Sequence, residues 1–219
     1  MFANRRSAGR QVAERLQHLR PEKPVVLALP RGGVPVGFEI AERLEAPLEI
    51  ALVRKIGVPW QPELALGAVV GGADPQVVVN EALAADLGID ESYVAGETAR
   101  QLKEIERRRR MYLGDRAPLP LSGRTVIIVD DGIATGSTVR AALRAVRAAG
   151  ARKIVLAVPV APEETIERLR AEVDEIVCVL APSPFIAVGA HYDQFPQLAD
   201  ADVVALLEER HQAMTRSAV

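Results

Sequence analysis

Residues 126–138 read VIIVDDGIATGST, and this stretch decides the fold class. Its four β-branched residues predict a buried strand, which is followed by two adjacent carboxylates, Asp130 and Asp131, and by an amphipathic helix expected over 137–149. In open parallel sheets, ligands bind beyond the carboxyl ends of the strands, and the N–H groups at a helix N-terminus attract anions. The stretch therefore predicts an anion site with carboxylates beside it.

The turn between this strand and helix is rich in small residues whose backbone N–H and hydroxyl groups can donate to a phosphate. They are Ala134, Thr135, Gly136, Ser137 and Thr138. The two carboxylates would repel that phosphate unless they faced another part of the ligand, such as the hydroxyls of a sugar or a hydrated Mg²⁺. The inferred ligand is a sugar phosphate.

Outward from this motif, short Val, Ile and Leu runs alternate with segments of helical period, which is typical of a parallel sheet covered by helices. Strands are expected over 25–29, 48–53, 66–70, 76–79, 124–129, 153–158 and 174–180. Helices are expected over 7–19, 34–45, 91–113, 137–149, 162–171 and 200–212. The predicted fold class is α/β with a parallel, doubly wound sheet, most of whose strands are buried on both faces.

Three segments do not follow this alternation. Residues 54–65 and 181–199 contain several prolines and are expected to be irregular. Residues 91–118 form a highly charged helix with two interpretations: an arm that closes over a ligand, or a solvated helix packed through Leu102, Ile105 and Leu113.

A second strand–turn–helix pattern occurs at residues 25–37, VVLALPRGGVPVG. Its turn holds Arg31, Gly32 and Gly33, and a guanidinium can grip a phosphate through two parallel hydrogen bonds. The chain thus offers two anion sites, which a sugar with phosphate at both ends would bridge.

The 126–138 motif resembles the phosphoribosyl pyrophosphate (PRPP) binding motif of the type I phosphoribosyltransferases. The resemblance implies that Asp130 and Asp131 hold the ribose 2′- and 3′-hydroxyls, and that 134–138 holds the 5′-phosphate. It places the pyrophosphate loop at 31–33, with a strained or cis peptide there. It also implies a homodimer.

The resemblance further implies one domain over 1–219. Its core would cover about 24–180, a flap or helical arm about 91–118, and a C-terminal hood about 181–200.

Arg54 and Lys55 end the expected strand 48–53, at the same sheet edge as the two turns. Two cations there favour stabilisation of a departing pyrophosphate, although a pair of solvated surface charges is the alternative. The resemblance also allows one of the arginines at 107–110 to contact the pyrophosphate, without indicating which.

The tail 185–195, FIAVGAHYDQF, resembles the base-binding region of hypoxanthine-type members. By that resemblance Phe185 stacks on the base and Asp193 helps to hold the metal and pyrophosphate, although the aromatic-to-glycine spacing is one residue longer here. His191 is interpreted as structural. Ala134 occupies the position of an aspartate in the 6-oxopurine enzymes, so the acceptor base stays open.

Composition excludes several classes of protein. The chain has 219 residues, 27 Lys plus Arg against 29 Asp plus Glu, and one cysteine, Cys178. A net charge of −2 argues against bulk binding of nucleic acid, and one cysteine makes neither an internal disulfide nor a zinc site. No apolar run reaches the ~20 residues of a spanning helix, so a cytoplasmic protein without a membrane partner is expected.

Competing motifs are absent. Gly136 stands where a Walker A loop needs Lys, and neither glycine-rich turn matches the Rossmann G-x-G-x-x-G fingerprint. The remaining alternatives are a non-catalytic PRPP sensor and a phosphohydrolase; the chain shows no helix-turn-helix for the first and no further clustered metal ligands for the second.

The sequence therefore predicts a Mg²⁺-dependent phosphoribosyltransferase that transfers the phosphoribosyl group from PRPP to a nucleobase-like nitrogenous acceptor and releases pyrophosphate. Asp130, Asp131 and Asp193 are the expected carboxylates near the metal. The candidate catalytic residues are Arg31 and Lys55, toward the leaving pyrophosphate, and Asp131, toward the ribose.

Overall fold

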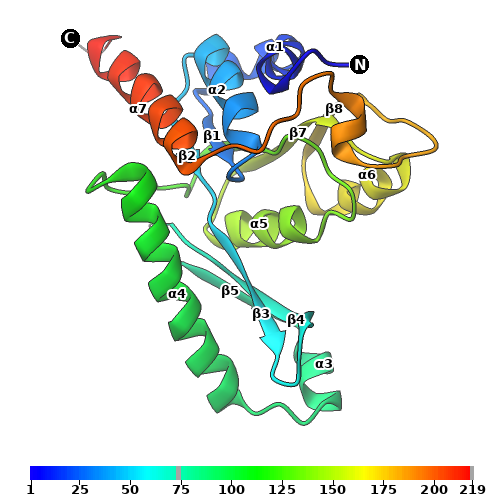
Figure 1. The fold of residues 1–219 in the computed structure, drawn as a ribbon. Helices are drawn as coiled ribbons and strands as arrows, with labels where there is room; N and C mark the ends of the chain where they lie inside the picture. Colours follow the sequence, from blue (N-terminus) through cyan, green and yellow to red (C-terminus); the bar gives the residue numbers. More distant parts are fainter. Residues whose placement is uncertain (73–74, 218–219) are drawn as a thin grey trace.

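A computed structural model of the protein describes residues 1–72 and 75–217 and contains a central parallel sheet, as the sequence predicts (Figure 1). The sheet has five strands in the order β2-β1-β6-β7-β8, and every neighbouring pair is parallel. The strands are β1 (Val25–Ala28), β2 (Leu48–Ile50), β6 (Thr125–Val129), β7 (Lys153–Val160) and β8 (Glu175–Leu180). The order places β1 and β6, the strands that precede the two anion turns, side by side.

Helices cover both faces of this sheet, which confirms the doubly wound class. The covering helices are α1 (Arg5–Arg15), α2 (Gly33–Leu44), α5 (Ser137–Ala148) and α6 (Glu163–Leu169). Successive residues of β6 alternate between the two layers: Ile127 packs with α1 and α2, and Ile128 packs with α5 and α6. Short 3₁₀ turns, η1 (Gln17–Glu22) and η2 (Arg170–Glu172), follow α1 and α6.

A second, antiparallel sheet corrects part of the sequence prediction. The expected strand 48–53 is broken, because β2 ends at Ile50 and β3 (Val53–Val58) pairs with β4 (Gln61–Val70). β5 (Gln76–Val79) pairs with the other edge of β4. The segment 54–65 is therefore largely a β-hairpin rather than irregular, and the strands expected at 66–70 and 76–79 do not belong to the parallel sheet.

Two long helices pack around this second sheet. α4 (Glu91–Leu113) follows a short helix, α3 (Glu81–Asp86), and contacts β3, β4 and α7 (Asp200–Ser217). Ile105 and Leu113 are buried there, and Leu102 is partly buried beside them. The expected packing through Leu102, Ile105 and Leu113 is thus confirmed for α4, which ends at Leu113, so that 114–118 lies outside the helix. Figure 1 shows α4 and the second sheet projecting together from the core.

The hood segment is tied to the N-terminus. It is mostly irregular, as expected, with one 3₁₀ turn, η3 (Val188–His191). Phe2 forms a parallel bridge with Tyr192, and the backbone N–H of Asp193 donates to the carbonyl of Phe2 at 2.8 Å. The first residues of the chain therefore lie against the end of the sheet where the two anion turns are found.

Among the described residues, no helix is both long enough and apolar enough to span a bilayer.

Candidate functional site

The two turns predicted as anion sites meet at one edge of the parallel sheet. The backbone N–H of Leu29 donates to the carbonyl of Val129 at 2.8 Å. Gly33 is so close to β6 that an added Cβ would lie 2.6 Å from the same carbonyl oxygen. A Cβ on Gly32 would lie 2.0 Å from Oδ2 of Asp131. The peptide bond Pro30–Arg31 is cis, as the family resemblance implied.

The adjacent carboxylates differ in their surroundings. Burial raises the pKa of Asp130 well above its ordinary value, and the negative charge of Asp131 raises it further. The backbone N–H of Asp131 donates to Oδ1 of Asp130 at 2.8 Å, which fixes the Asp130 side chain. Asp131 forms an ion pair with Arg5, whose Nε lies 2.7 Å from Oδ2. The fold therefore keeps two carboxylates close together although their burial and mutual repulsion cost free energy.

The loop that precedes α5 presents donors to solvent. Thr135, Ser137 and Thr138 are exposed, and no described side chain caps the N-terminus of α5. Gly136 has φ of 78°, in the left-handed region that favours glycine. The hydroxyl of Thr165 donates to the carbonyl of Ala134 at 2.8 Å and anchors the loop to α6. This loop can bind a phosphate through backbone N–H and hydroxyl groups.

Arg54 and Lys55 belong to β3, so their side chains alternate between the two faces of that strand. Nε of Arg54 donates to Oε1 of Gln101 on α4 at 3.0 Å. Lys55 is exposed and lines a cavity of about 510 Å³ together with Ser137 and Thr138. Lys55 thus lies beside the phosphate loop and Arg54 is held by α4, while both side chains also line a neighbouring cavity of about 410 Å³.

Arg31 projects from its turn toward α7. Its Nη1 lies 3.9 Å from Oδ1 of Asp200, which also accepts a hydrogen bond from the Tyr112 hydroxyl at 2.5 Å. The pKa of Arg107 is raised mainly by Glu104 and more weakly by the charge of Asp200. Arg107 therefore lies within electrostatic range of Asp200, the carboxylate that Arg31 also faces.

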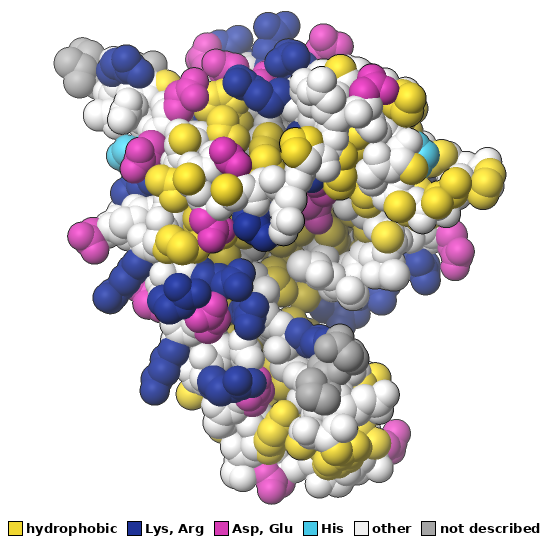
Figure 2. Space-filling view, in the orientation of Figure 1, with side chains coloured by type: hydrophobic (Ala, Val, Ile, Leu, Met, Phe, Trp, Pro, Cys, Tyr) yellow, Lys and Arg dark blue, Asp and Glu magenta, His cyan; other side chains and the backbone are white. Residues whose placement is uncertain are grey.

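The other arginines of the run at 107–110 have local partners. Arg108 and Arg110 pair with glutamates on α4, and Arg109 donates to the carbonyl of Arg116. Figure 2 shows Lys and Arg side chains over α4, with Asp and Glu side chains among them.

The two candidate residues of the tail, Phe185 and Asp193, lie in different surroundings. Phe185 is half-buried and its ring stacks on the His191 ring with centroids 5.5 Å apart, so its contacts are those of a packed residue. Asp193 is exposed on the hood. Within the described residues no group of three metal-ligating side chains occurs, so Asp130, Asp131 and Asp193 do not form one cluster.

Three residues at the site were missed by sequence reasoning. Arg5 contacts the Asp131 carboxylate, the Tyr192 hydroxyl donates to the Asp131 carbonyl at 2.5 Å, and Thr165 anchors Ala134. These contacts join residues 31–126 positions apart in the chain. Nothing in the local sequence around Arg5 or Thr165 indicates such partners.

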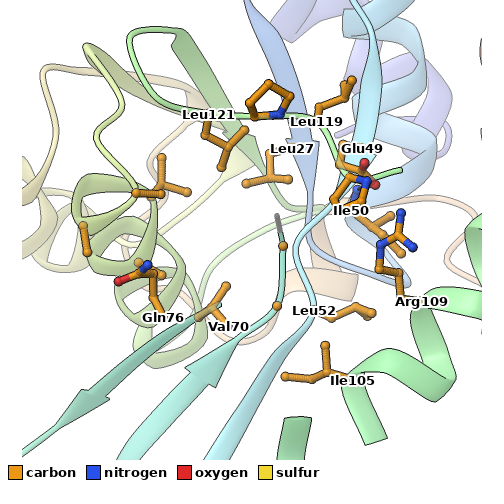
Figure 3. Close-up of a pocket in the computed structure, with 18 of the residues that line it drawn as sticks. Leu27, Glu49, Ile50, Leu52, Val70, Gln76, Ile105, Arg109, Leu119 and Leu121 are labelled. Carbon is orange, nitrogen blue, oxygen red and sulfur yellow. Dashed lines mark hydrogen bonds between the residues drawn. The ribbon is translucent and has the colours of Figure 1, made fainter. Parts of the chain in front are cut away.

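A separate cavity of about 430 Å³ lies between the parallel sheet and α4 (Figure 3). Leu121 and Ile105 contribute apolar walls, and Glu49 and Arg109 lie on one side of it. Burial raises the pKa of Glu49. Apart from Arg109, one of the four arginines considered for contact with pyrophosphate, no predicted site residue lines this cavity, so it is distinct from the two anion turns.

Comparison with known proteins agrees with this geometry. The family model for the phosphoribosyl transferase domain matches residues 5–194. The chain belongs to the phosphoribosyl transferase domain family. The match includes both anion turns and also Arg5.

Relatives support the same assignment. The chain is 46% identical over 212 residues to "Putative phosphoribosyl transferase MT0597" of Mycobacterium tuberculosis CDC 1551 / Oshkosh. The same values hold for "Putative phosphoribosyl transferase Rv0571c" of strain H37Rv. The alignment covers 97% of this chain and 47% of each relative, so the chain spans about half their length.

A solved structure shows the same fold. TT1426 from Thermus thermophilus is 45% identical and superposes with a TM-score of 0.83, covering 95% of this chain and 98% of that one.

Proposed function

We propose that this phosphoribosyl transferase domain binds PRPP and transfers its 5-phosphoribosyl group to a nitrogenous, nucleobase-like acceptor with release of pyrophosphate. The observation that carries the proposal is the contact between the two turns, in which Gly32 lies directly against the Asp131 carboxylate. One ligand can therefore engage the turn with Arg31 and the two carboxylates at once. The family assignment supports PRPP as that ligand.

The residues have distinct tasks in this reaction. Breaking the bond between ribose and pyrophosphate gives the ribose oxocarbenium character and leaves negative charge on the departing group. Arg31 supplies positive charge for the pyrophosphate, and Lys55, which lines the cavity beside Ser137 and Thr138, supplies it next to the loop that binds the 5′-phosphate. Asp130 and Asp131 orient the ribose through its hydroxyls, and residues 134–138 bind the 5′-phosphate. Alignment and charge stabilisation account for the catalysis, so no covalent nucleophile is needed.

Magnesium fits this arrangement as an ion carried by the ligand. The described residues contain no cluster of three metal-ligating side chains, and Asp131 is already paired with Arg5. Mg²⁺ prefers to keep waters and to bind through one or two carboxylates together with substrate phosphates. Asp130 and Asp131 are the carboxylates that would hold it. The ion would supply charge neutralisation on the diphosphate.

The first test is a calorimetric titration of PRPP with MgCl₂ into the wild-type protein and into Asp131→Asn. The wild type should bind, and the variant should lose roughly 100-fold or more in affinity because it loses a charged ribose ligand. A screen of bases for pyrophosphate release then identifies the acceptor and separates an enzyme from a sensor. A folded wild-type protein that does not bind PRPP would refute the proposal.

The two cations of β3 should behave differently. Lys55→Gln is expected to weaken PRPP binding roughly tenfold, because Lys55 faces the cavity shared with Ser137 and Thr138. Arg54→Gln should leave the affinity within about twofold and lower the free energy of unfolding by about 0.5–1.5 kcal/mol, because its hydrogen bond to Gln101 is lost. Calorimetry and urea unfolding measure the two effects. Equal loss of affinity in both variants would contradict this assignment of faces.

A further inference from the structure

Arg5 makes several contacts at the edge of the candidate site. Its Nε donates to Oδ2 of Asp131 at 2.7 Å, and its Nη1 donates to the carbonyl of Pro196 at 2.8 Å. Its guanidinium carbon lies 3.7 Å from the centroid of the Phe195 ring. The guanidinium is thus held by a carboxylate, a carbonyl and an aromatic face at the same time.

These contacts are shielded from solvent. The side chains of Arg5 and Asp131 are 10% and 14% exposed. A charge-assisted hydrogen bond in such surroundings is stronger and less screened than a surface ion pair. A buried arginine with this set of partners is therefore restricted to one orientation, and it restricts the carboxylate in turn.

The Asp131 carboxylate lies in a crowded position next to another acidic residue. It follows another acidic residue, and Gly32 lies so close that an added Cβ would be 2.0 Å from Oδ2. The guanidinium of Arg5 offsets the repulsion between Asp130 and Asp131, because it lies within electrostatic range of both. The Tyr192 hydroxyl holds the Asp131 backbone from the hood.

We propose that Arg5 is a positioning residue, which holds the Asp131 carboxylate in the orientation that binds the ribose hydroxyls of PRPP. This inference rests on the proposed function. It makes the N-terminal segment a part of the binding site, although this segment precedes the first strand of the sheet. It also connects the hood to the ribose site, because the same guanidinium contacts Pro196 and Phe195.

The test compares Arg5→Gln with Arg5→Lys and with a matched control, Arg6→Gln. Arg6 lies on the same helix, pairs with Glu39 and stacks over Phe38, without a contact to Asp131 among its described interactions. Calorimetry measures binding of PRPP with MgCl₂, and of pyrophosphate with MgCl₂, which lacks the ribose.

Arg5→Gln should weaken PRPP binding roughly 10- to 100-fold and change pyrophosphate binding by less than about twofold. Arg5→Lys should recover most of the affinity, since it keeps the charge, and Arg6→Gln should bind PRPP like the wild type. In urea unfolding of the free proteins, Arg5→Gln combined with Asp131→Asn should be destabilised by less than the sum of the two single changes.

Several results would overturn the inference. They are wild-type or tighter PRPP affinity in Arg5→Gln, equal losses for PRPP and pyrophosphate, a loss in Arg6→Gln of the same size, or additive unfolding effects. A wild-type protein that does not bind PRPP is a different result: it refutes the proposed function itself, and the positioning role falls with it.

Discussion

Replacement of Gly32 by alanine is expected to abolish measurable PRPP binding while the protein remains folded. The backbone of Gly32 has φ of −59° and ψ of −37°, which alanine adopts without strain. The added Cβ, however, would lie 2.0 Å from Oδ2 and 2.4 Å from Cγ of Asp131. The carboxylate must therefore leave its position, and its ion pair with Arg5 is broken. We expect a loss of at least about 100-fold in affinity and about 1–3 kcal/mol in unfolding free energy.

Gly96→Ala is the matched control for this change. Gly96 is exposed in the interior of α4, and an added Cβ meets nothing within 4 Å. The substitution should raise the free energy of unfolding by about 0.5–1 kcal/mol, because alanine is the better helix former, and leave PRPP binding unchanged. Calorimetry and urea unfolding of both variants make the comparison. If Gly32→Ala bound PRPP with the affinity of the wild type, the contact between the two turns would not be a feature of the ligand site.

The central part of the fold could be predicted because its signals are local. Both the 126–138 stretch and the 25–37 stretch combine an apolar strand, a small-residue turn and a helix start within thirteen residues. Parallel strands joined by helices then bring the turns to one edge of the sheet. The prediction that the two turns are neighbours follows from this rule, and the order β2-β1-β6-β7-β8 confirms it.

The second sheet was not predicted correctly because its prolines were interpreted as marks of irregular structure. Pro59 lies in the turn between β3 and β4, where the ring is well tolerated. Pro62 lies where the pairing shifts register, between the pairs Gly57–Ala65 and Val58–Gln61. Such irregular positions accept proline without loss of the sheet. The error had a functional consequence, since β3 places Lys55 beside the phosphate loop and Arg54 against Gln101 of α4.

The contact of Arg5 with Asp131 could not be predicted for a different reason. The two residues are 126 positions apart, and Arg5 begins a helix in which Arg6 and Arg10 also occur. No periodicity distinguishes the arginine that turns toward the site from those that pair with Glu39. The distinction comes from the bridge between Phe2 and Tyr192, which is a tertiary contact.

The two adjacent carboxylates should affect stability in opposite directions. Burial and the charge of Asp131 raise the pKa of Asp130 in the folded protein above its unfolded value. The contribution of Asp130 to stability is therefore complete below the unfolded pKa and is lost as the pH rises through the folded pKa. At pH 7.5, Asp130→Asn should raise the free energy of unfolding by about 1 kcal/mol, because asparagine avoids the cost of either burying or neutralising a carboxylate and keeps the acceptor for the Asp131 N–H.

Asp131→Asn should lower the free energy of unfolding by about 1–3 kcal/mol, because it leaves the buried Arg5 guanidinium without its charged partner. Both variants should lose PRPP binding. Urea unfolding between pH 4 and pH 7.5 separates the cases, since the gain from Asp130→Asn should shrink as the pH falls. A destabilised Asp130→Asn at pH 7.5 would show that the Asp130 charge is stabilised by the fold.

The opposite signs follow from one feature, which is that the Arg5 guanidinium contacts only Asp131 of the two neighbouring acids. Asp130 thus lowers the stability of the free protein at neutral pH, as expected of a residue retained for binding a ligand.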